Sequence, residues 1–462
     1  MKVLFVSRYV DPFDARANQP IINQAKALIN TFKVEVDILT WPYKDLWSGK
    51  IPIEKPTAQP LPISLSGLKY NVINCPLEWN ESANGDTIDD LSWKHAIAYG
   101  VEILKSLNPD ILHLHHRTGL WWILESAQML SIPTIYTNYD FGIGCLRTTL
   151  LTGTGKLCDG KISPKICAEC ITKGRSSLFG KINEWLVKFW LGGNVIYFIS
   201  KIPFLKYQII SKNLVKSPAL MRTSRHQARL KRVMKKLDFL ITPSNFGSIF
   251  FERLGVNRQN ILIQPWFHEK LRINSNKIFD PHYFTLTYVG RVSPEKGVHL
   301  VFEALKHLEH LPSLKFKIIG ADESKYCLDL KNRYKESVGH HIVEWHSWSP
   351  IHNAMVTTDV TIIPSTIMDN TPLALIESIL YKTPVIATSI PTIVDYLVDG
   401  ESGYLADFNS AKSFAEQIEK AFTNKNAIRS GHINFPIIST CDEYCKNILN
   451  IYKLVLKKKG VC

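Results

Sequence analysis

Two basic side chains follow a short apolar run in the C-terminal half of the sequence. The run ends at Gly290, and the next residues include Arg291 and Lys296. Each cation could donate a charge-assisted hydrogen bond to a phosphate, worth about 1.5–3 kcal/mol, and both stay protonated near neutral pH. The spacing predicts a phosphate site, and a solvated loop with a Glu295–Lys296 pair is the alternative.

A second polar segment, Asp369, Asn370 and Thr371, lies between a strand pattern and a helix pattern. The backbone N–H groups of Thr371 and Leu373 would be unpaired at the start of that helix, where they could bind a phosphate or a sugar hydroxyl. Glu377 follows Asp369 by slightly more than two helical turns, so both carboxylates could border one cleft. An N-capping Asp and a surface Glu would give the same pattern.

The elements that must position these side chains alternate along most of the chain. Short apolar or β-branched runs alternate with segments of helical period, as in strand–helix units on parallel sheets. The predicted strands form two series, at residues 2–7, 34–40, 110–115, 133–137, 239–244 and 261–265, and at residues 284–290, 314–320, 341–346, 360–365 and 384–389. The pattern predicts an α/β protein with two doubly wound domains.

We expect the first domain over residues 1–265, with an insertion at about 141–237, and the second over residues 283–430. A polar stretch without apolar period separates them. A last helix over about 440–457 is expected to pack back on the first domain. In sheets of this kind ligands bind beyond the carboxyl ends of the strands, which is where both polar segments lie.

In their order and spacing these motifs resemble those of the retaining family 4 glycosyltransferases, which have the GT-B fold of two Rossmann-like domains facing a cleft. The resemblance covers nearly the whole chain. It rests on the Gly-Arg and Glu-Lys-Gly sequences of the first loop, on Gly320 at the end of the next strand, on an acidic residue separated from Glu377 by seven residues, and on the sequence VDGESGYL.

The resemblance implies a nucleoside-diphosphate sugar as the donor. It places Arg291 and Lys296 on the diphosphate, Asp369 on the donor sugar and Glu377 on the ribose hydroxyls. The donor site would comprise Gly290, Gly320, Asn370, Thr371, Leu373 and Glu377. The sequence departs from the family where Asp369 stands for the usual Glu, and where Pro391 and Thr392 stand for the usual glycines.

The first domain offers a histidine and an acid at two strand ends. Alternation puts His113 and His115 on one face of their strand, and the family resemblance favours His115 beside the donor phosphate and the transferring sugar. A core or surface histidine is the alternative. The next strand ends at Tyr139 and Asp140, with Tyr where relatives have His, and Asp140 is a candidate acceptor contact.

Four of the nine cysteines lie close together in the sequence, at Cys145, Cys158, Cys167 and Cys170. Four thiolates suit a tetrahedral structural zinc site, and Cys167 and Cys170 have the spacing of one half of such a site. Free thiols are the alternative, because a second closely spaced pair is missing. The odd cysteine number favours a reducing compartment.

The positive charge is concentrated in one stretch. The chain has 55 Lys and Arg against 41 Asp and Glu, a net charge of +14, and residues 181–236 carry thirteen basic residues and one acidic residue. With its interleaved Trp, Phe and Tyr side chains this stretch predicts contact with an anionic membrane surface. A helical hairpin with a solvated basic face is the alternative. No apolar run is long enough to span a bilayer, so we expect a cytoplasmic protein, peripheral on the inner face of the membrane.

The sequence therefore predicts a metal-independent retaining glycosyltransferase that needs no cofactor for catalysis. It has no Asp-x-Asp pair for a metal-bound diphosphate. The expected acceptor is a polyprenyl-linked saccharide of a bacterial surface polysaccharide. A GT-B nucleotide-sugar epimerase is the closest alternative. A nucleic-acid-binding protein ranks lower, because Arg291, Lys296, Asp369 and Glu377 would have no role in it, and we expect no nucleic-acid partner.

Overall fold

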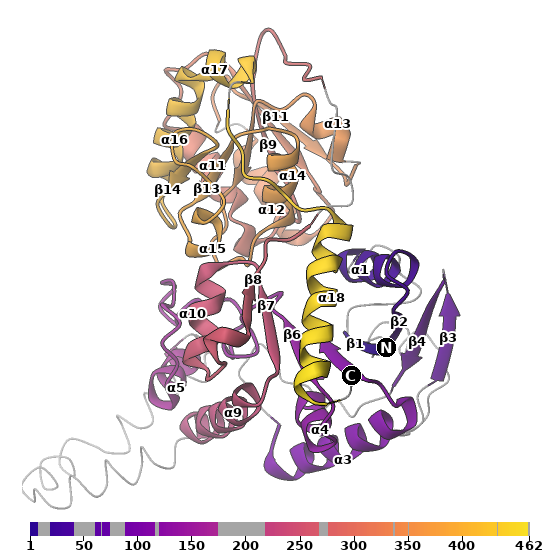
Figure 1. Ribbon diagram of the computed structural model, residues 1–462. Helices are drawn as coiled ribbons and strands as arrows, with labels where there is room; N and C mark the ends of the chain where they lie inside the picture. The colour runs from indigo at the N-terminus through magenta and orange to yellow at the C-terminus, as the bar shows by residue number, and fades with distance from the viewer. Residues whose placement is uncertain are drawn as a thin grey trace, which may run out of the picture.

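The computed structural model describes residues 1–7, 19–40, 61–65, 67–73, 88–115, 120–173, 218–267, 276–335, 338–349, 351–431 and 433–460. It contains two α/β domains, one above the other in Figure 1. Most of the stretch at residues 181–236, including its aromatic residues, lies outside the described part of the chain. None of the described helices is long and apolar enough to cross a membrane.

The N-terminal domain is built on an eight-stranded sheet of order β3-β4-β2-β1-β5-β6-β7-β8. Its strands are β1 (Lys2–Val6), β2 (Glu35–Thr40), β3 (Leu61–Leu65), β4 (Leu68–Val72), β5 (Ile111–Leu114), β6 (Thr134–Thr137), β7 (Phe239–Thr242) and β8 (Ile261–Ile263). All neighbours pair in parallel except β3 and β4, which form an antiparallel hairpin at the edge. The central strands are buried on both faces, which explains their nearly continuous apolar sequences.

Helices cover both faces of this sheet (Figure 1). The helices of this domain are α1 (Gln19–Asn30), α3 (Asp90–Leu107), α4 (Ile123–Met129), α5 (Pro164–Lys173), α9 (Pro218–Lys235) and α10 (Asn245–Arg253). Asp89 caps α3 by accepting hydrogen bonds from the N–H groups of Leu91 and Ser92.

The C-terminal domain is built on a six-stranded parallel sheet of order β11-β10-β9-β12-β13-β14. Its strands are β9 (Phe284–Val289), β10 (Leu314–Ile319), β11 (Ile342–His346), β12 (Val360–Ile363), β13 (Val385–Thr388) and β14 (Gly403–Ala406). Its helices are α11 (Val298–Leu305), α12 (Lys325–Tyr334), α13 (Ile351–Met355), α14 (Leu373–Leu380), α15 (Pro391–Val394), α16 (Ala411–Thr423) and α17 (Lys425–Ser430). The strand order reverses direction between β9 and β12, which makes their carboxyl ends the topological switch point.

The last helix, α18 (Cys441–Lys458), returns to the N-terminal domain and packs beside α1. A capping box of Thr440 and Glu443 starts it. Its buried Tyr452 hydroxyl lies 2.7 Å from Nδ1 of His113, whose Nε2 lies 2.7 Å from the Thr137 hydroxyl. His113 therefore joins two central strands to α18.

Hydrogen bonds join the two domains at the inner edge of the cleft. The Tyr396 hydroxyl donates to the Pro243 carbonyl at 2.7 Å, and the Asp395 carboxylate accepts from the Asn245 N–H at 2.9 Å. Asp395 thus stands at the start of α10, where it complements the positive end of that helix.

Candidate functional site

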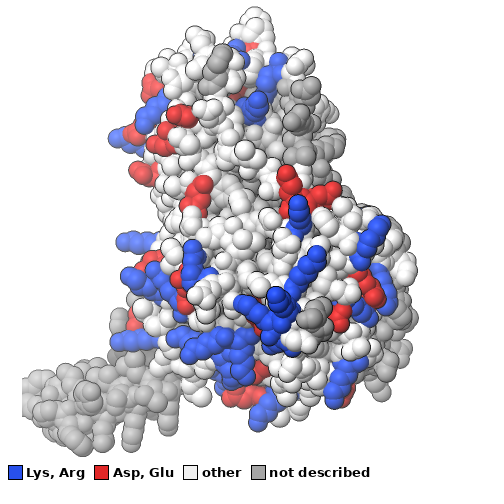
Figure 2. Space-filling model, viewed as in Figure 1, with Lys and Arg blue, Asp and Glu red and all other residues white. Residues whose placement is uncertain are grey.

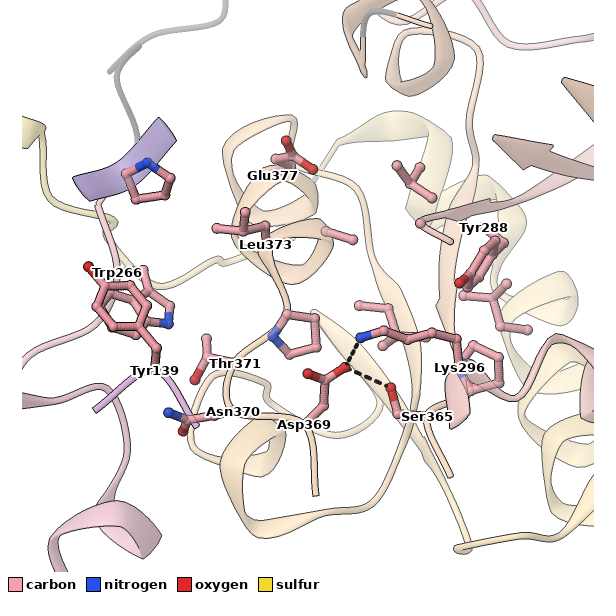
Figure 3. Close-up of a pocket in the computed structure, with 18 of the residues that line it drawn as sticks. Tyr139, Trp266, Tyr288, Lys296, Ser365, Asp369, Asn370, Thr371, Leu373 and Glu377 are labelled. Atoms are coloured by element: carbon pink, nitrogen blue, oxygen red, sulfur yellow. Dashed lines mark hydrogen bonds and ion pairs between the residues drawn. The ribbon is translucent and has the colours of Figure 1, made fainter. Parts of the chain in front are cut away.

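A cavity of about 500 Å³ opens at the switch point of the C-terminal sheet, between the two domains (Figure 3). The C-terminal domain contributes most of its wall, with Gly290, Lys296, Ser365, Asp369 and Glu377 among the lining residues. Among the described residues of the N-terminal domain, those that line the cavity are apolar or aromatic, namely Pro20, Tyr139, Trp266 and Phe267. The charged side chains among the described lining residues therefore all lie on the C-terminal wall.

Glycines let the loops that follow β9, β10 and β12 approach one another. Gly297 has a φ of 72°, and a Cβ there would lie 1.8 Å from the Pro364 carbonyl oxygen. Gly320 has a φ of 104°, and its Cβ would lie 2.4 Å from the carbonyl oxygen of Gly290. Any larger residue would push these loops apart, so both glycines are required by the close approach.

Lys296 and Asp369 form an ion pair in the cavity, as Figure 3 shows. The Asp369 carboxylate also accepts a hydrogen bond from the Ser365 hydroxyl at 3.2 Å. The two charged side chains are only 25% and 18% exposed. The loop that holds Lys296 and the polar segment that starts at Asp369 thus meet in the cavity. Lys296 pairs with Asp369, and not with Glu295 as the alternative had it.

The segment from Asp369 to Thr371 is fixed by contacts on both sides. The Thr392 hydroxyl donates to the Asp369 carbonyl, and the Asn370 side-chain amide donates across the cleft to the Asn138 carbonyl at 2.9 Å. The Thr371 N–H donates to the Asp369 carbonyl at 3.1 Å, so the expectation that it is unpaired is wrong. The loop therefore belongs to the domain interface as well as to the cavity.

The helix α14 begins at the cavity. Pro372 is its N-cap residue and no side chain caps the helix, so Asp369 is not an N-cap. Leu373 lines the cavity as the first helical residue, where the N–H groups lack helical acceptors. One turn later Glu377 also lines the cavity, and burial raises the pKa of its carboxyl to about 7. This carboxyl is thus poised to change charge near neutral pH.

Arg291 does not line the cavity in this structure. Its side chain is 76% exposed, and its guanidinium lies 3.4 Å from the carboxylate of Glu295, four residues later in the same loop. The expected phosphate contact of Arg291 therefore requires a different side-chain direction from the one observed, and it stays a prediction.

His115 is fully buried and lies behind the aromatic wall of the cavity. Its ring packs 4.2 Å from the Phe5 ring, and its Nδ1 lies 3.5 Å from the hydroxyl of Tyr139. Burial and the neighbouring His113 hold its pKa well below the usual value, so its ring is neutral. Tyr139, stacked on Trp266 at 4.6 Å, faces the cavity in its place.

Asp140 also lies off the cavity lining. Its carboxylate accepts a hydrogen bond from the Gly142 N–H at 2.7 Å and so closes a turn after β6. Its role as an acceptor contact stays a prediction.

The four clustered cysteines are described as free thiols. Burial raises the pKa of Cys145 to about 11 and that of Cys167 to about 12, so both are protonated at neutral pH. Within the described ranges no three His, Cys, Asp or Glu side chains are placed to hold a metal ion. The side chains as placed do not fit a zinc ion, and the zinc site stays a prediction from the sequence.

Residues 270–430 match the family described as glycosyl transferases group 1. The match covers the C-terminal domain. The chain is 28% identical over 204 residues to a lipopolysaccharide 1,2-N-acetylglucosaminetransferase of Salmonella typhimurium, a match that covers 40% of this chain and 53% of the relative. It is 26% identical over 168 residues to the capsular polysaccharide biosynthesis glycosyltransferase CapM of Staphylococcus aureus, covering 34% and 43%. The chain spans about half the length of these curated relatives.

Solved structures similar to the whole chain establish its fold. The Anabaena protein Alr3699/HepE in complex with UDP matches with a TM-score of 0.55 at 13% identity, over 100% of both chains. A glycosyltransferase of Rickettsia africae ESF-5 matches with a TM-score of 0.57 at 15% identity, over 99% of this chain and 98% of that one. The predicted GT-B fold is confirmed.

The cavity is also lined by residues to which the sequence analysis gave no role. Tyr288 and Ser365 line the cavity from β9 and from the loop after β12, and Trp348 lines it from the loop after β11. Ser365 ends the strand predicted at residues 360–365, and Trp348 lies two residues beyond the strand predicted at residues 341–346. Their position at strand ends was the available signal, because ligands bind there.

Proposed function

We propose that this chain is a retaining glycosyltransferase that moves a sugar from a nucleoside diphosphate to a saccharide acceptor. The Lys296–Asp369 pair carries the proposal, because it sets a cation and a carboxylate side by side in the cavity at the switch point. The match of residues 270–430 to the group 1 glycosyl transferases supports the same reaction class.

In this proposal Lys296 stabilises the leaving diphosphate. The bond from the anomeric carbon to the phosphate oxygen breaks, and negative charge grows on the diphosphate as it leaves. A fixed cation there stabilises the transition state more than the ground state. The acceptor oxygen bonds to the same face of the anomeric carbon, and its hydroxyl proton goes to the departing phosphate oxygen.

The carboxylates have separate tasks. Asp369 accepts hydrogen bonds from donor-sugar hydroxyls after Lys296 has turned to the phosphate. Glu377 accepts hydrogen bonds from the ribose hydroxyls. Lys296 and the N–H groups at the start of α14 supply the positive charge at the diphosphate, so the proposed reaction needs no metal ion.

The acceptor would enter along the wall formed by Tyr139, Trp266 and Phe267. Aromatic faces suit the apolar faces of pyranose rings and exclude water from the reacting atoms. Relatives named for lipopolysaccharide, capsule and colanic acid synthesis favour a saccharide of a bacterial surface polysaccharide as the acceptor. We propose in addition that this saccharide is carried on a polyprenyl lipid.

A basic face on the N-terminal domain supports contact with an anionic membrane. Figure 2 shows Lys and Arg side chains gathered over the region of α9 and α18. The exposed cations near the ends of these two helices are Lys231, Arg232, Lys235, Lys236, Lys453, Lys457, Lys458 and Lys459. Lys459 joins the two helix ends through an ion pair of 3.3 Å with Asp238. The charge thus forms one continuous surface, peripheral to the active cavity.

Product analysis tests this function against the epimerase alternative. The protein is incubated with UDP-, GDP- and ADP-sugars, with and without a lipid-linked saccharide fraction. A glycosyltransferase gives a product only when acceptor is present, and NMR shows the donor's anomeric configuration retained in the new linkage. Release of a free, epimerised sugar without acceptor would refute the proposal.

A further inference from the structure

A strained turn carries the Asp369 carboxylate into the cavity. Thr371 has a φ of 55°, in the left-handed region that a β-branched residue rarely adopts. Its N–H donates back to the carbonyl of Asp369, two residues earlier, at 3.1 Å. A backbone conformation of this kind persists only where the surrounding structure holds it. The contacts of the turn therefore determine where the Asp369 side chain points.

Thr392, on the short helix α15, makes two of these contacts. It is fully buried and does not line the cavity. Its hydroxyl donates a hydrogen bond to the Asp369 carbonyl, and its own carbonyl lies 3.5 Å from the Thr371 hydroxyl. The turn is thus joined to α15 on both sides of Asn370.

The helix α15 is in turn held by the N-terminal domain. Four residues after Thr392, the Tyr396 hydroxyl donates to the Pro243 carbonyl at 2.7 Å and lies 3.5 Å from the Thr371 hydroxyl. Because this hydroxyl joins the N-terminal domain to the end of α15, the position of α15 depends on how the domains are docked. Thr392 links that position to Asp369.

The turn also contacts the N-terminal domain directly. The Met368 N–H donates to the Thr149 carbonyl at 3.1 Å, and the Asn370 side-chain amide donates to the Asn138 carbonyl at 2.9 Å. The residues on each side of Asp369 are therefore hydrogen-bonded to the segment that follows β6. All these contacts exist together only when the domains are docked as in this structure.

We propose that Thr392 is a positioning residue, which couples the docking of the two domains to the placement of the Asp369 carboxylate. This inference rests on the proposed function, in which Asp369 binds the donor-sugar hydroxyls. Thr392 contacts neither donor nor acceptor and acts only through Asp369. Sugar transfer then requires the docked domains and the Thr392 hydroxyl, whereas nucleotide binding by the C-terminal domain requires neither.

Thr392→Val removes the hydroxyl and keeps the shape of the side chain. We expect the maximal transfer rate to fall at least tenfold, because a small displacement of a positioned group has an effect of this size. Calorimetric affinity for UDP, GDP or ADP should stay within twofold of the wild type. Thr392→Ala, which also lacks the hydroxyl and cannot overpack, should behave as Thr392→Val does. Thr392→Ser keeps the hydroxyl and should restore most of the rate.

Thr285→Val is the matched control. Thr285 is a fully buried residue of β9, and its hydroxyl has no hydrogen-bond partner among the residues that the structure describes. The same substitution there should leave the transfer rate unchanged.

A double-mutant cycle separates positioning from a general loss of structure. In an Asp369→Asn background, Thr392→Val should lower the rate no further, because both changes act at one carboxylate. Equal losses in the two backgrounds would overturn the inference. So would a normal rate in Thr392→Val, or a nucleotide affinity that falls as much as the rate. A wild type that transfers sugar from none of the UDP-, GDP- and ADP-sugars would instead refute the proposed function.

Discussion

The ammonium group of Lys296 donates a hydrogen bond to the carboxylate of Asp369, which comes 73 residues later in the chain. The glycine turn at Gly297 and the loop after β12 bring them together at the switch point of the sheet. In the free protein each charge neutralises the other. In the proposed function a bound diphosphate would take Lys296 as its counter-ion and release Asp369 to the sugar, so ligand binding would also set the arrangement of the Asp369 carboxylate.

Replacing Lys296 with Ala should lower turnover by a factor on the order of 100 or more, because one preorganised charge at the leaving group is lost. The same loss is expected for Arg291→Ala if its side chain turns to the diphosphate. Initial rates with saturating donor measure the effect. Lys325→Ala, an exposed change in the same domain, should be neutral. Near-normal turnover of Lys296→Ala would rule out its role at the leaving group.

Asp369→Asn should spare nucleotide binding and impair sugar transfer, because the amide cannot take the place of the carboxylate at the sugar hydroxyls. Asp369→Glu is the informative comparison, since related enzymes commonly have Glu there and the longer side chain can restore part of the activity. Titration with UDP or GDP, alongside transfer rates, separates the two effects. A large loss of nucleotide affinity in Asp369→Asn would place this residue at the nucleotide instead.

Glu377 should make donor binding depend on pH. Burial raises the pKa of its carboxyl from 4.5 to about 7. Between these pH values the folded, ligand-free protein keeps the proton and the unfolded chain has lost it. The contribution of this group to folding stability therefore falls as the pH rises from 4.5 to 7. Ribose hydroxyls donate to the ionised form, so donor affinity should rise with pH through about 7. Calorimetry at pH 6, 7 and 8 measures this. Glu377→Gln should bind more weakly and without that slope, and an unchanged slope in the variant would exclude Glu377 as its source.

The basic face should hold the protein on anionic membranes. Changing Lys231, Lys235, Lys236 and Lys457 to Gln should weaken vesicle binding by at least tenfold, at about 1 kcal/mol for each charge near the surface. Sedimentation with phosphatidylglycerol vesicles measures this. The matched control changes the exposed Lys325, Lys335, Lys412 and Lys420 of the C-terminal domain. Equal losses in both variants would mean that net charge, and not this face, determines binding.

Periodicity predicted the fold well because both sheets bury their central strands on two faces. Every predicted strand coincides with an observed one to within a few residues. The missed strands have weak signals: β3 contains Pro62, β4 follows a tight turn at Gly67, and β14 begins with Gly403. β3 and β14 are also edge strands, which carry less apolar sequence than central ones.

The site was harder to predict because sequence spacing shows on which face of a strand or helix a residue lies, but not how deeply its side chain is buried. Alternation correctly put His115 on the same face of its strand as His113, but the rings of Phe5 and Tyr139 cover it. Likewise the distance of four residues from Arg291 to Glu295 allowed a local ion pair that the motif does not reveal. The cysteines are near in sequence, yet their placement depends on loops, and elemental analysis of untagged protein decides whether they bind zinc.

In the proposed function the cavity at the switch point binds a nucleoside-diphosphate sugar through Lys296. Thermal unfolding of the wild type and Lys296→Ala with UDP-, GDP- and ADP-sugars measures this binding. A ligand at 100 times its dissociation constant stabilises the folded state by about 2.7 kcal/mol. We predict that one nucleotide-sugar class raises the melting temperature of the wild type, and that this rise is largely lost in Lys296→Ala. No shift with any of the three classes, or an equal shift in both proteins, would contradict the account.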